Sequence, residues 1–204
     1  MNHLFASLIL AANLGDPGTI PQPTAVEQKS SEQVTVYRAI DGDTVQLDDG
    51  RRVRLAGIDA PEKSGDQPYW SESKQLLQKL CGGYKLLQFR DTGQGGWGRE
   101  LGDLYYTKGG RRYSIARTMV RSGGAWYWDK YGGRDRAELA KMHQQAQAER
   151  RGLWATSNPL APWEWRKGTR SKPAAAAPRG GGSLYQQRGL QLPSVFRDNC
   201  PGGS

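Results

Sequence analysis

One stretch of the chain, residues 39–62, constrains its fold more than any other. The stretch reads AIDGDTVQLDDGRRVRLAGIDAPE, in which short runs of alternating apolar and polar residues are separated by Asp-Gly pairs. Alternation of this kind is typical of β-strands with one buried face, and Asp-Gly pairs favour hairpin turns. The pattern predicts strands over residues 33–40, 44–49 and 51–58, joined as a short meander.

The same stretch sets five charged side chains at or near the ends of these strands. They are Asp41, Asp43, Arg54, Asp59 and Glu62. Carboxylates supply hard oxygen ligands for a divalent cation, and a spare carboxylate can act as an acid or a base. An arginine supplies a planar, bidentate cation for phosphate oxygens. Because a short hairpin joins the strands, these side chains can converge on one point, as hydrolysis of a phosphodiester requires.

Each piece also has an ordinary structural interpretation. An Asp-Gly-Asp sequence between two apolar runs is commonly a simple turn, and a single arginine in a strand commonly faces solvent. The segment from Asp59 to Glu62 can likewise be a proline turn with exposed acids. The joint occurrence of the five residues favours the functional interpretation. A zinc site is not indicated, because the two histidines and two cysteines are scattered along the chain.

Apolar residues at helical spacing between Trp70 and Leu80 predict a first helix, which Gly82 and Gly83 end. Two more strands are expected over residues 85–90 and 100–107. A second helix is expected over residues 114–122, with Gly123 as its stop.

A third helix is expected to begin at Asp135, where Glu138 follows at the spacing of a capping box. Its apolar residues Leu139, Met142 and Ala146 are a core stripe. Three strands, a helix, two strands and then helices predict an α+β fold that is mainly β. The specific prediction is a five-stranded OB-fold barrel with about three helices and flexible tails.

Three segments, AIDGDTVQL, VRLAGIDAPE and GWGRELGDLYY, resemble the thermonuclease family, the staphylococcal nuclease-like domains. The resemblance covers about residues 34–154. It is specific, because Arg54 stands five residues before Asp59 and eight before Glu62, as the family pattern requires.

The resemblance implies a role for each acidic residue of the stretch. Asp43 and Asp59 would be carboxylate ligands of a catalytic Ca²⁺, and the backbone carbonyl of Ala60 would be a further ligand. Ca²⁺ suits such a set, because it accepts six to eight oxygens in loose geometry. Glu62 would orient or deprotonate the attacking water, and Asp41 would support the site without touching the metal.

The resemblance also implies how the substrate is held. Arg54 and Arg99 would grip the scissile phosphate. Trp97 stands where the family usually has a tyrosine, and Tyr131 lies in an aromatic segment similar to the family's. Both are candidates for contact with the substrate, because aromatic rings stack on splayed bases. Ala60 replaces a threonine often seen there, which a backbone ligand tolerates.

The function implied is a Ca²⁺-dependent endonuclease or exonuclease acting on DNA and RNA with little sequence specificity. We expect it to prefer single-stranded or frayed substrate, because paired bases resist unstacking, and the resemblance implies 3′-phosphate products. The alternative is a catalytically silent OB-fold module that only binds nucleic acid. The joint presence of Arg54, Arg99 and the three carboxylates Asp43, Asp59 and Glu62 favours the enzyme.

Composition indicates one domain, residues 33–166, between two tails. Residues 1–32 form a leader whose apolar run, residues 4–10, resembles the core of a signal peptide. This run favours a secreted or periplasmic protein, with a cytoplasmic protein as the alternative. It is too short to span a membrane. A monomer is expected.

Residues 167–204 form a tail rich in Ala, Pro and Gly that is expected to be disordered. The chain carries a net charge of +9, of which the tail, with six basic residues and one acidic residue, holds +5. The remaining +4 and the basic tail fit a polyanionic substrate, with the tail adding electrostatic capture. A solvated tail without such a role is the ordinary alternative.

Overall fold

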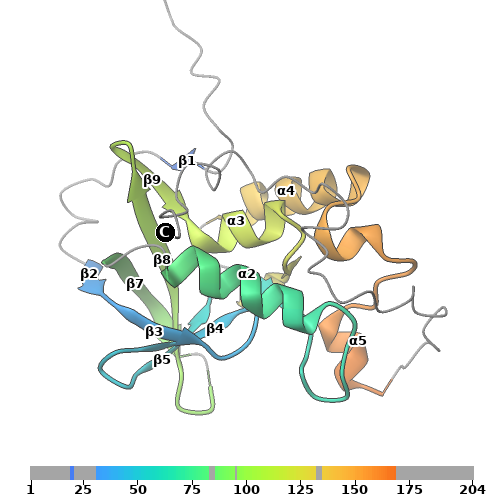
Figure 1. Ribbon diagram of the computed structural model, residues 1–204, viewed down its shortest axis with the longest axis horizontal. Coiled ribbons are helices and arrows are strands. Elements are labelled where there is room, and N and C mark those ends of the chain that lie inside the picture. Colours follow the sequence, from blue (N-terminus) through green and yellow to red (C-terminus); the bar gives the residue numbers. More distant parts are fainter. Residues whose placement is uncertain (1–18, 21–30, 83–85, 95, 132–134, 169–204) are drawn as a thin grey trace, which may run out of the picture.

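The computed structural model describes residues 19–20, 31–82, 86–94, 96–131 and 135–168 (Figure 1). It shows a mixed α+β fold, as predicted. Figure 1 shows the strands gathered on one side of the molecule and the helices α2, α3 and α4 on the other.

The predicted meander is present. Strands β3 (Val36–Ala39), β4 (Thr44–Leu47) and β5 (Arg52–Leu55) pair antiparallel in sequence order. The strand predicted over residues 33–40 is divided at Thr35, so that β2 (Ser31–Val34) precedes β3 and pairs with β7 instead. The strand predicted over residues 51–58 is divided too, because a turn at Ala56 and Gly57 precedes the next strand.

Strand β8 (Glu100–Lys108) is the centre of the sheet, because it pairs with three other strands. It runs parallel to β5 and antiparallel to β7 (Leu87–Gln94) and β9 (Arg111–Ser114). Strand β1 (Thr19–Ile20) pairs with β9. Strand β9 was not predicted, because its run of two arginines, a tyrosine and a serine lacks apolar alternation. The ring of Tyr113 in β9 stacks at 5.1 Å on that of Tyr106 in β8.

The pairing path runs β3-β4-β5-β8-β7-β2, with β9 and β1 branching from β8. All five predicted strands are present in divided or altered form, and the sheet contains more strands than predicted. Within the part of the chain that the structure describes, strand pairing does not close the sheet into a barrel. A second, two-stranded sheet pairs β6 (Ile58–Asp59) with β10 (Trp126–Tyr127).

All three predicted helices are confirmed. They are α2 (Trp70–Gly82), α3 (Ile115–Arg121) and α4 (Arg136–Ala148). Their buried faces hold the residues expected from the periodicity, such as Leu76 and Leu80 of α2. Two short 3-10 helices, η1 (Asp129–Tyr131) and η2 (Gly152–Ala155), flank α4.

A further short helix, α5 (Pro162–Arg166), was not predicted. Pro162 stands at the first turn of α5, a position where proline suits a helix.

The predicted capping box of α4 is wrong. Asp135 does stand at the N-cap, but its side chain makes no capping hydrogen bond. Arg117 of α3 takes the carboxylate instead, with Nε donating to Oδ2 at 2.9 Å. An ion pair between helices has replaced the local contact that the sequence pattern indicated.

The core lies between the sheet and the helices, where Val45, Val53 and Leu104 meet Leu77 and Met119. Among the described helices, none is long and apolar enough to cross a membrane. The apolar run 4–10 and the tail beyond residue 168 lie outside the described residues, so the predictions for them stay predictions.

Candidate active site

The strand register brings the predicted residues together. Thr44 of β4 pairs with Arg54 of β5, so Asp43, which directly precedes Thr44, lies beside Arg54. The chain then turns at residues 56–57 and returns as β6, whose Asp59 pairs with Trp126 of β10. Two tight turns therefore place Asp43, Arg54 and Asp59 around one point.

Gly42 allows the first of these turns to lie against the helix α2. A Cβ atom at this position would meet Ser73 Oγ at 1.9 Å and the Cβ of Ala60 at 2.6 Å. Ser73 is itself fixed, because its hydroxyl donates to the carbonyl of Gly124 at 2.6 Å. The Asp-Gly-Asp sequence is thus required by close packing and not by a positive φ, which would be the requirement of a simple tight turn.

Arg54 lies between two buried carboxylates. Its Nη2 donates to Asp59 Oδ1 at 2.8 Å and to the carbonyl of Ile58 at 3.1 Å, and its Nη1 contacts Asp43 Oδ1. Arg54 is only 4% exposed and Asp59 only 1%. The lone strand arginine is therefore not on a solvated face, and the ordinary interpretation of Arg54 is wrong.

Asp43 is held from three sides. Its Oδ1 also accepts from the hydroxyl of Thr44 at 2.9 Å, and its Oδ2 accepts from the backbone N–H of Ala60 at 2.8 Å. Asp41 lies next to it, with Oδ1 accepting from the backbone N–H of Asp43 at 3.0 Å. Asp41 and Asp43 are thus fixed by backbone groups, so little ordering of these two acids is left to occur when a ligand binds.

Glu62 lies in the loop that follows β6, and Gln67 holds this loop in place. The side-chain oxygen of Gln67 accepts from the backbone N–H of Glu62 at 2.8 Å, and the backbone N–H of Gln67 donates to the carbonyl of Glu62 at 3.1 Å. Glu62 keeps its carboxylate partly exposed. It is placed at the mouth of the site, whereas Asp43 and Asp59 lie inside.

A residue that the sequence analysis missed joins the site. Arg166, at the end of α5, donates from Nη2 to Asp59 Oδ2 at 2.8 Å and from Nη1 to Asp59 Oδ1 at 3.3 Å. Its Nη1 also contacts Glu62 Oε1. In the sequence this arginine directly follows the run Pro-Trp-Glu-Trp. Nothing in this run indicates that the arginine contacts acids about a hundred positions earlier.

Burial sets the protonation of the acids. It raises the pKa of Asp41 to about 7, with a further increase from the charge of Asp43. Burial also raises the pKa of Asp59 to about 6, although both of its arginines oppose this. Burial pushes the pKa of Asp43 upward as well, but Arg54 and the hydrogen bond from Ala60 outweigh it, so that this pKa is lowered. Ionising the buried carboxylates Asp41 and Asp59 therefore costs free energy, and a bound cation would lower this cost.

The other predicted substrate contacts come from the turn before β8 and from η1. Arg99 directly precedes β8, and its Nε donates within its own turn to the carbonyl of Gly96 at 3.3 Å. Trp97 lies in the same turn and is 93% exposed. The backbone of Tyr131 ends η1, but its side chain lies outside the described part of the structure.

The donor set fits a hard divalent cation. Asp43 and Asp59 contact one guanidinium, so both carboxylates face the same small volume, and carboxylate oxygens are the ligands that Ca²⁺ and Mg²⁺ prefer. Within the described ranges, no three histidine, cysteine or carboxylate side chains already converge as a metal site. Arg54 and Arg166 occupy the positions between the acids.

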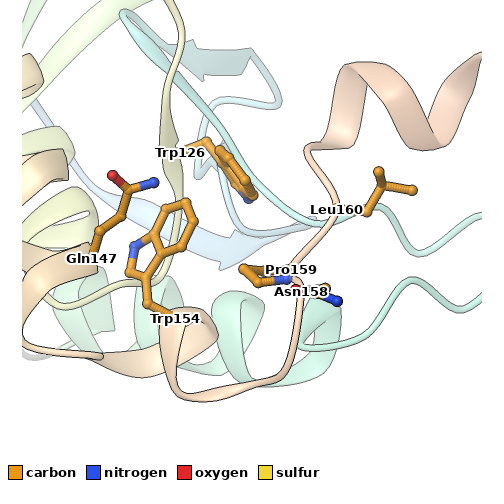
Figure 2. A pocket seen from close by; sticks show the side chains of 6 residues that line it. All are labelled: Trp126, Gln147, Trp154, Asn158, Pro159 and Leu160. Atoms are coloured by element: carbon orange, nitrogen blue, oxygen red, sulfur yellow. The ribbon is translucent and has the colours of Figure 1, made fainter. Parts of the chain in front are cut away.

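A hollow of about 480 Å³ lies elsewhere, between α4 and the segment that leads to α5 (Figure 2). The lining residues carry no formal charge; they are Trp126, Gln147, Trp154, Asn158, Pro159 and Leu160. Trp126 and Trp154 pack edge to face with ring centroids 4.2 Å apart. The hollow is an aromatic packing region, and the chemistry of the acids lies outside it.

Comparison with known proteins assigns a family to this arrangement. Residues 52–156 match the family model described as staphylococcal nuclease homologue. The chain is 35% identical over 134 residues to an uncharacterized endonuclease of Escherichia coli, an alignment that covers 64% of this chain and 82% of that protein. It is 34% identical over 144 residues to a micrococcal nuclease of Shigella flexneri, covering 67% and 81%.

Plant relatives are larger. The chain is 41% identical over 119 residues to a staphylococcal-like nuclease of Arabidopsis thaliana, covering 58% of this chain and 34% of the relative. The chain thus spans about a third of the length of the plant proteins it matches.

Proposed function

The chain belongs to the staphylococcal nuclease family, and from this premise we propose that it is a nuclease that hydrolyses phosphodiester bonds with the help of a divalent cation. The observation that carries the proposal is the position of Arg54 between Asp43 and Asp59, with Glu62 at the mouth of the site. This arrangement supports a nuclease site, and the family match and the names of the relatives support the same class of reaction.

Asp43 and Asp59 are the proposed carboxylate ligands, with the carbonyl of Ala60 as a backbone ligand. We propose Ca²⁺ as the metal, because two carboxylates and a carbonyl leave the remaining positions to water, which its loose geometry tolerates. Bound there, the cation would supply positive charge to a phosphate oxygen. Asp41 keeps Asp43 in place through the backbone N–H.

Glu62 is the proposed base. It lies at the mouth of the site on a loop fixed by Gln67, so its carboxylate can take a proton from a water approaching from solvent. Arg54 is the proposed cation for the phosphate in the transition state, where preorganised charge is most effective. Arg99 is the second proposed phosphate contact, from the turn that joins β7 and β8.

We propose DNA and RNA as substrates, cut with little sequence specificity to leave 3′-phosphate ends. Trp97 supports a preference for unpaired strands, because a fully exposed indole at a turn is available for a splayed base. Tyr131 is proposed as a second stacking residue. Unstacking a paired base costs a few kcal/mol, so frayed A·T-rich segments are cut faster than stable G·C duplex.

The test is a comparison of initial rates on matched oligonucleotides at one salt concentration. The purified chain is incubated with Ca²⁺ and single-stranded DNA, single-stranded RNA, A·T-rich duplex or G·C-rich duplex, and the product ends are identified by mass spectrometry. Hydrolysis with the single strands cut fastest and 3′-phosphate ends is expected. Binding without hydrolysis on all four would replace the proposal with a nucleic-acid-binding module, and 5′-phosphate ends would contradict the proposed bond cleavage.

A further inference from the structure

Arg166 places a positive charge at the carboxylate oxygens proposed for the metal. It reaches both oxygens of Asp59, at 2.8 Å and 3.3 Å, and also contacts Glu62. Asp59 is 1% exposed, whereas the side chain of Arg166 is 39% exposed. The contact therefore joins a buried acid to an arginine that comes from the solvent side.

The backbone around Arg166 is tied to the loop that carries Glu62. Trp165 Nε1 donates to the carbonyl of Ser64 at 2.9 Å. Gln67, which holds the backbone of Glu62, donates from Nε2 to the carbonyl of Leu160 at 2.8 Å. The short helix is thus fixed to the site independently of the Arg166 side chain.

Aromatic rings guide the Arg166 side chain toward the acids. Its guanidinium carbon lies 5.2 Å from the centre of the Trp128 ring, a cation–π distance. Trp128 in turn stacks on Trp163 of α5 with ring centroids 5.8 Å apart and an angle of 10°. Trp128 is fixed at the other end, because its backbone N–H donates to the carbonyl of Gly57 at 2.9 Å.

The oxygens of Asp59 are then nearly fully engaged. Oδ1 accepts from Arg54 and Arg166, which uses both of its lone pairs, and Oδ2 accepts from Arg166. One lone pair of Oδ2 is left, so a metal ion that binds both oxygens of Asp59 needs a lone pair that Arg166 occupies, and its charge is repelled by the guanidinium. Arg54 is only 4% exposed and also holds Asp43, so Arg166 is the arginine that can leave toward solvent.

We propose that Arg166 is an internal counter-cation that competes with the divalent metal for Asp59 and must be displaced when the metal binds. The inference rests on the proposed function, because it takes Asp59 as a metal ligand. In the metal-free protein Arg166 also occupies Glu62, so the proposed base is withheld until the metal arrives. A doubly charged cation outcompetes the guanidinium, and the swing needs only the side chain, because α5 has its own contacts.

The test measures Ca²⁺ affinity by isothermal titration calorimetry on the full chain, with no nucleic acid present. Arg166→Gln removes the competing charge, so its Ca²⁺ affinity is expected to rise about tenfold. The matched control is Lys167→Gln, which removes the same charge one residue later, where the ammonium pairs with Glu164 at 2.9 Å and not with the site. Its Ca²⁺ affinity is expected to stay within about twofold of the original.

Arg166→Lys is the second variant, in case the glutamine disturbs the fold. An ammonium keeps the charge but cannot span both oxygens of Asp59 as the planar fork does, so an intermediate Ca²⁺ affinity is expected. Weaker or unchanged Ca²⁺ binding in Arg166→Gln would overturn the proposal, and so would an equal gain in Lys167→Gln.

Asp59→Asn separates failure of this inference from failure of the proposed function. If Asp59→Asn weakens Ca²⁺ binding while Arg166→Gln leaves it unchanged, Asp59 remains a ligand and only the competition is wrong. If Asp59→Asn has no effect, or the original chain binds no Ca²⁺, the metal assignment and the competition are both wrong.

Discussion

Two regions of the molecule each contain a buried arginine beside a buried aspartate, and they differ in their balance of charge. The site cluster consists of Asp41, Asp43, Asp59 and Glu62 with Arg54 and Arg166. The β7–β8 pair consists of Arg90 and Asp103, which lie opposite one another in the sheet. The Nη2 atom of Arg90 lies 2.5 Å from Oδ2 of Asp103. Both regions bury an arginine against an aspartate, with Arg54 4% and Arg90 9% exposed.

The β7–β8 pair joins one arginine to one carboxylate, and the hydroxyl of Tyr105 donates to the same carboxylate at 3.2 Å. Burial raises the pKa of Asp103, and the charge of Arg90 opposes it. In the site cluster four carboxylates share two arginines. At Asp41 the largest effect on the pKa after burial is the charge of Asp43, which raises it further, whereas at Asp103 it is the hydrogen bond from Arg90, which lowers it. A balanced pair serves the fold, whereas an excess of fixed negative charge favours binding of another cation.

The largest effect on turnover is expected when lysine replaces Arg54, and the same change at Arg90 is the matched comparison. Arg54→Lys should lower turnover roughly 10³-fold, because an ammonium cannot reproduce the planar fork that contacts two carboxylates and that we propose binds a phosphate. Arg90→Lys should change turnover by no more than a few-fold while lowering the free energy of unfolding by about 1 to 3 kcal/mol. Initial rates and urea denaturation of both variants check this. Equal losses of turnover would erase the distinction between the two regions.

A smaller effect is expected when an amide replaces a carboxylate. Asp43→Asn should weaken Ca²⁺ binding by about tenfold or more, because a hard cation loses one of two protein carboxylates. Asp103→Asn should leave Ca²⁺ affinity unchanged, although it removes a charge that is equally buried. Calorimetric titration of the two variants decides the matter. Ca²⁺ binding that depends on Asp103 would place the metal at the β7–β8 pair and contradict its assignment to the site cluster.

The smallest effect concerns pH. The pKa of Asp41 is about 7 in the folded chain against 3.8 as its ordinary value, so between about pH 4 and 7 the folded state binds more protons than the unfolded state. The free energy of unfolding of the metal-free protein therefore falls as pH rises through this window. Asp59, with a pKa of about 6, acts in the same direction.

Asp41→Asn keeps the acceptor for the backbone N–H of Asp43 and removes the charge. We compare the free energy of unfolding of Asp41→Asn with that of the original chain at each pH. The difference in favour of the variant should be at least about 1 kcal/mol larger at pH 8 than at pH 5, since one pKa unit corresponds to about 1.4 kcal/mol. Urea denaturation in chelator at the two pH values measures this difference. If the free energies of unfolding of the two proteins changed equally with pH, ionisation of Asp41 would not destabilise the fold.

The parts of the site that lie close together in the sequence could be predicted. Asp43, Arg54, Asp59 and Glu62 belong to one short meander, so strand register alone brings them together. The helices with a clear apolar stripe, such as α2, could be predicted for the same reason.

The parts that depend on distant contacts could not be predicted. Arg166 lies 107 positions after Asp59, and only packing of α5 on the Glu62 loop brings them together. Asp135 was read as a cap because the sequence does not reveal that Arg117 approaches it from another helix. Strand β9 forms because it pairs with β8, and its own residues carry little strand signal.

The central claim is that a bound divalent metal compensates the excess negative charge of the site cluster and enables hydrolysis. The most direct test is the initial rate of hydrolysis of single-stranded DNA as free Ca²⁺ is raised from zero in a chelator buffer. The account predicts no hydrolysis in excess chelator and a saturable rise with Ca²⁺, because Asp43 and Asp59 without a cation repel phosphate. Full hydrolysis in excess chelator would contradict the assignment of these carboxylates as metal ligands.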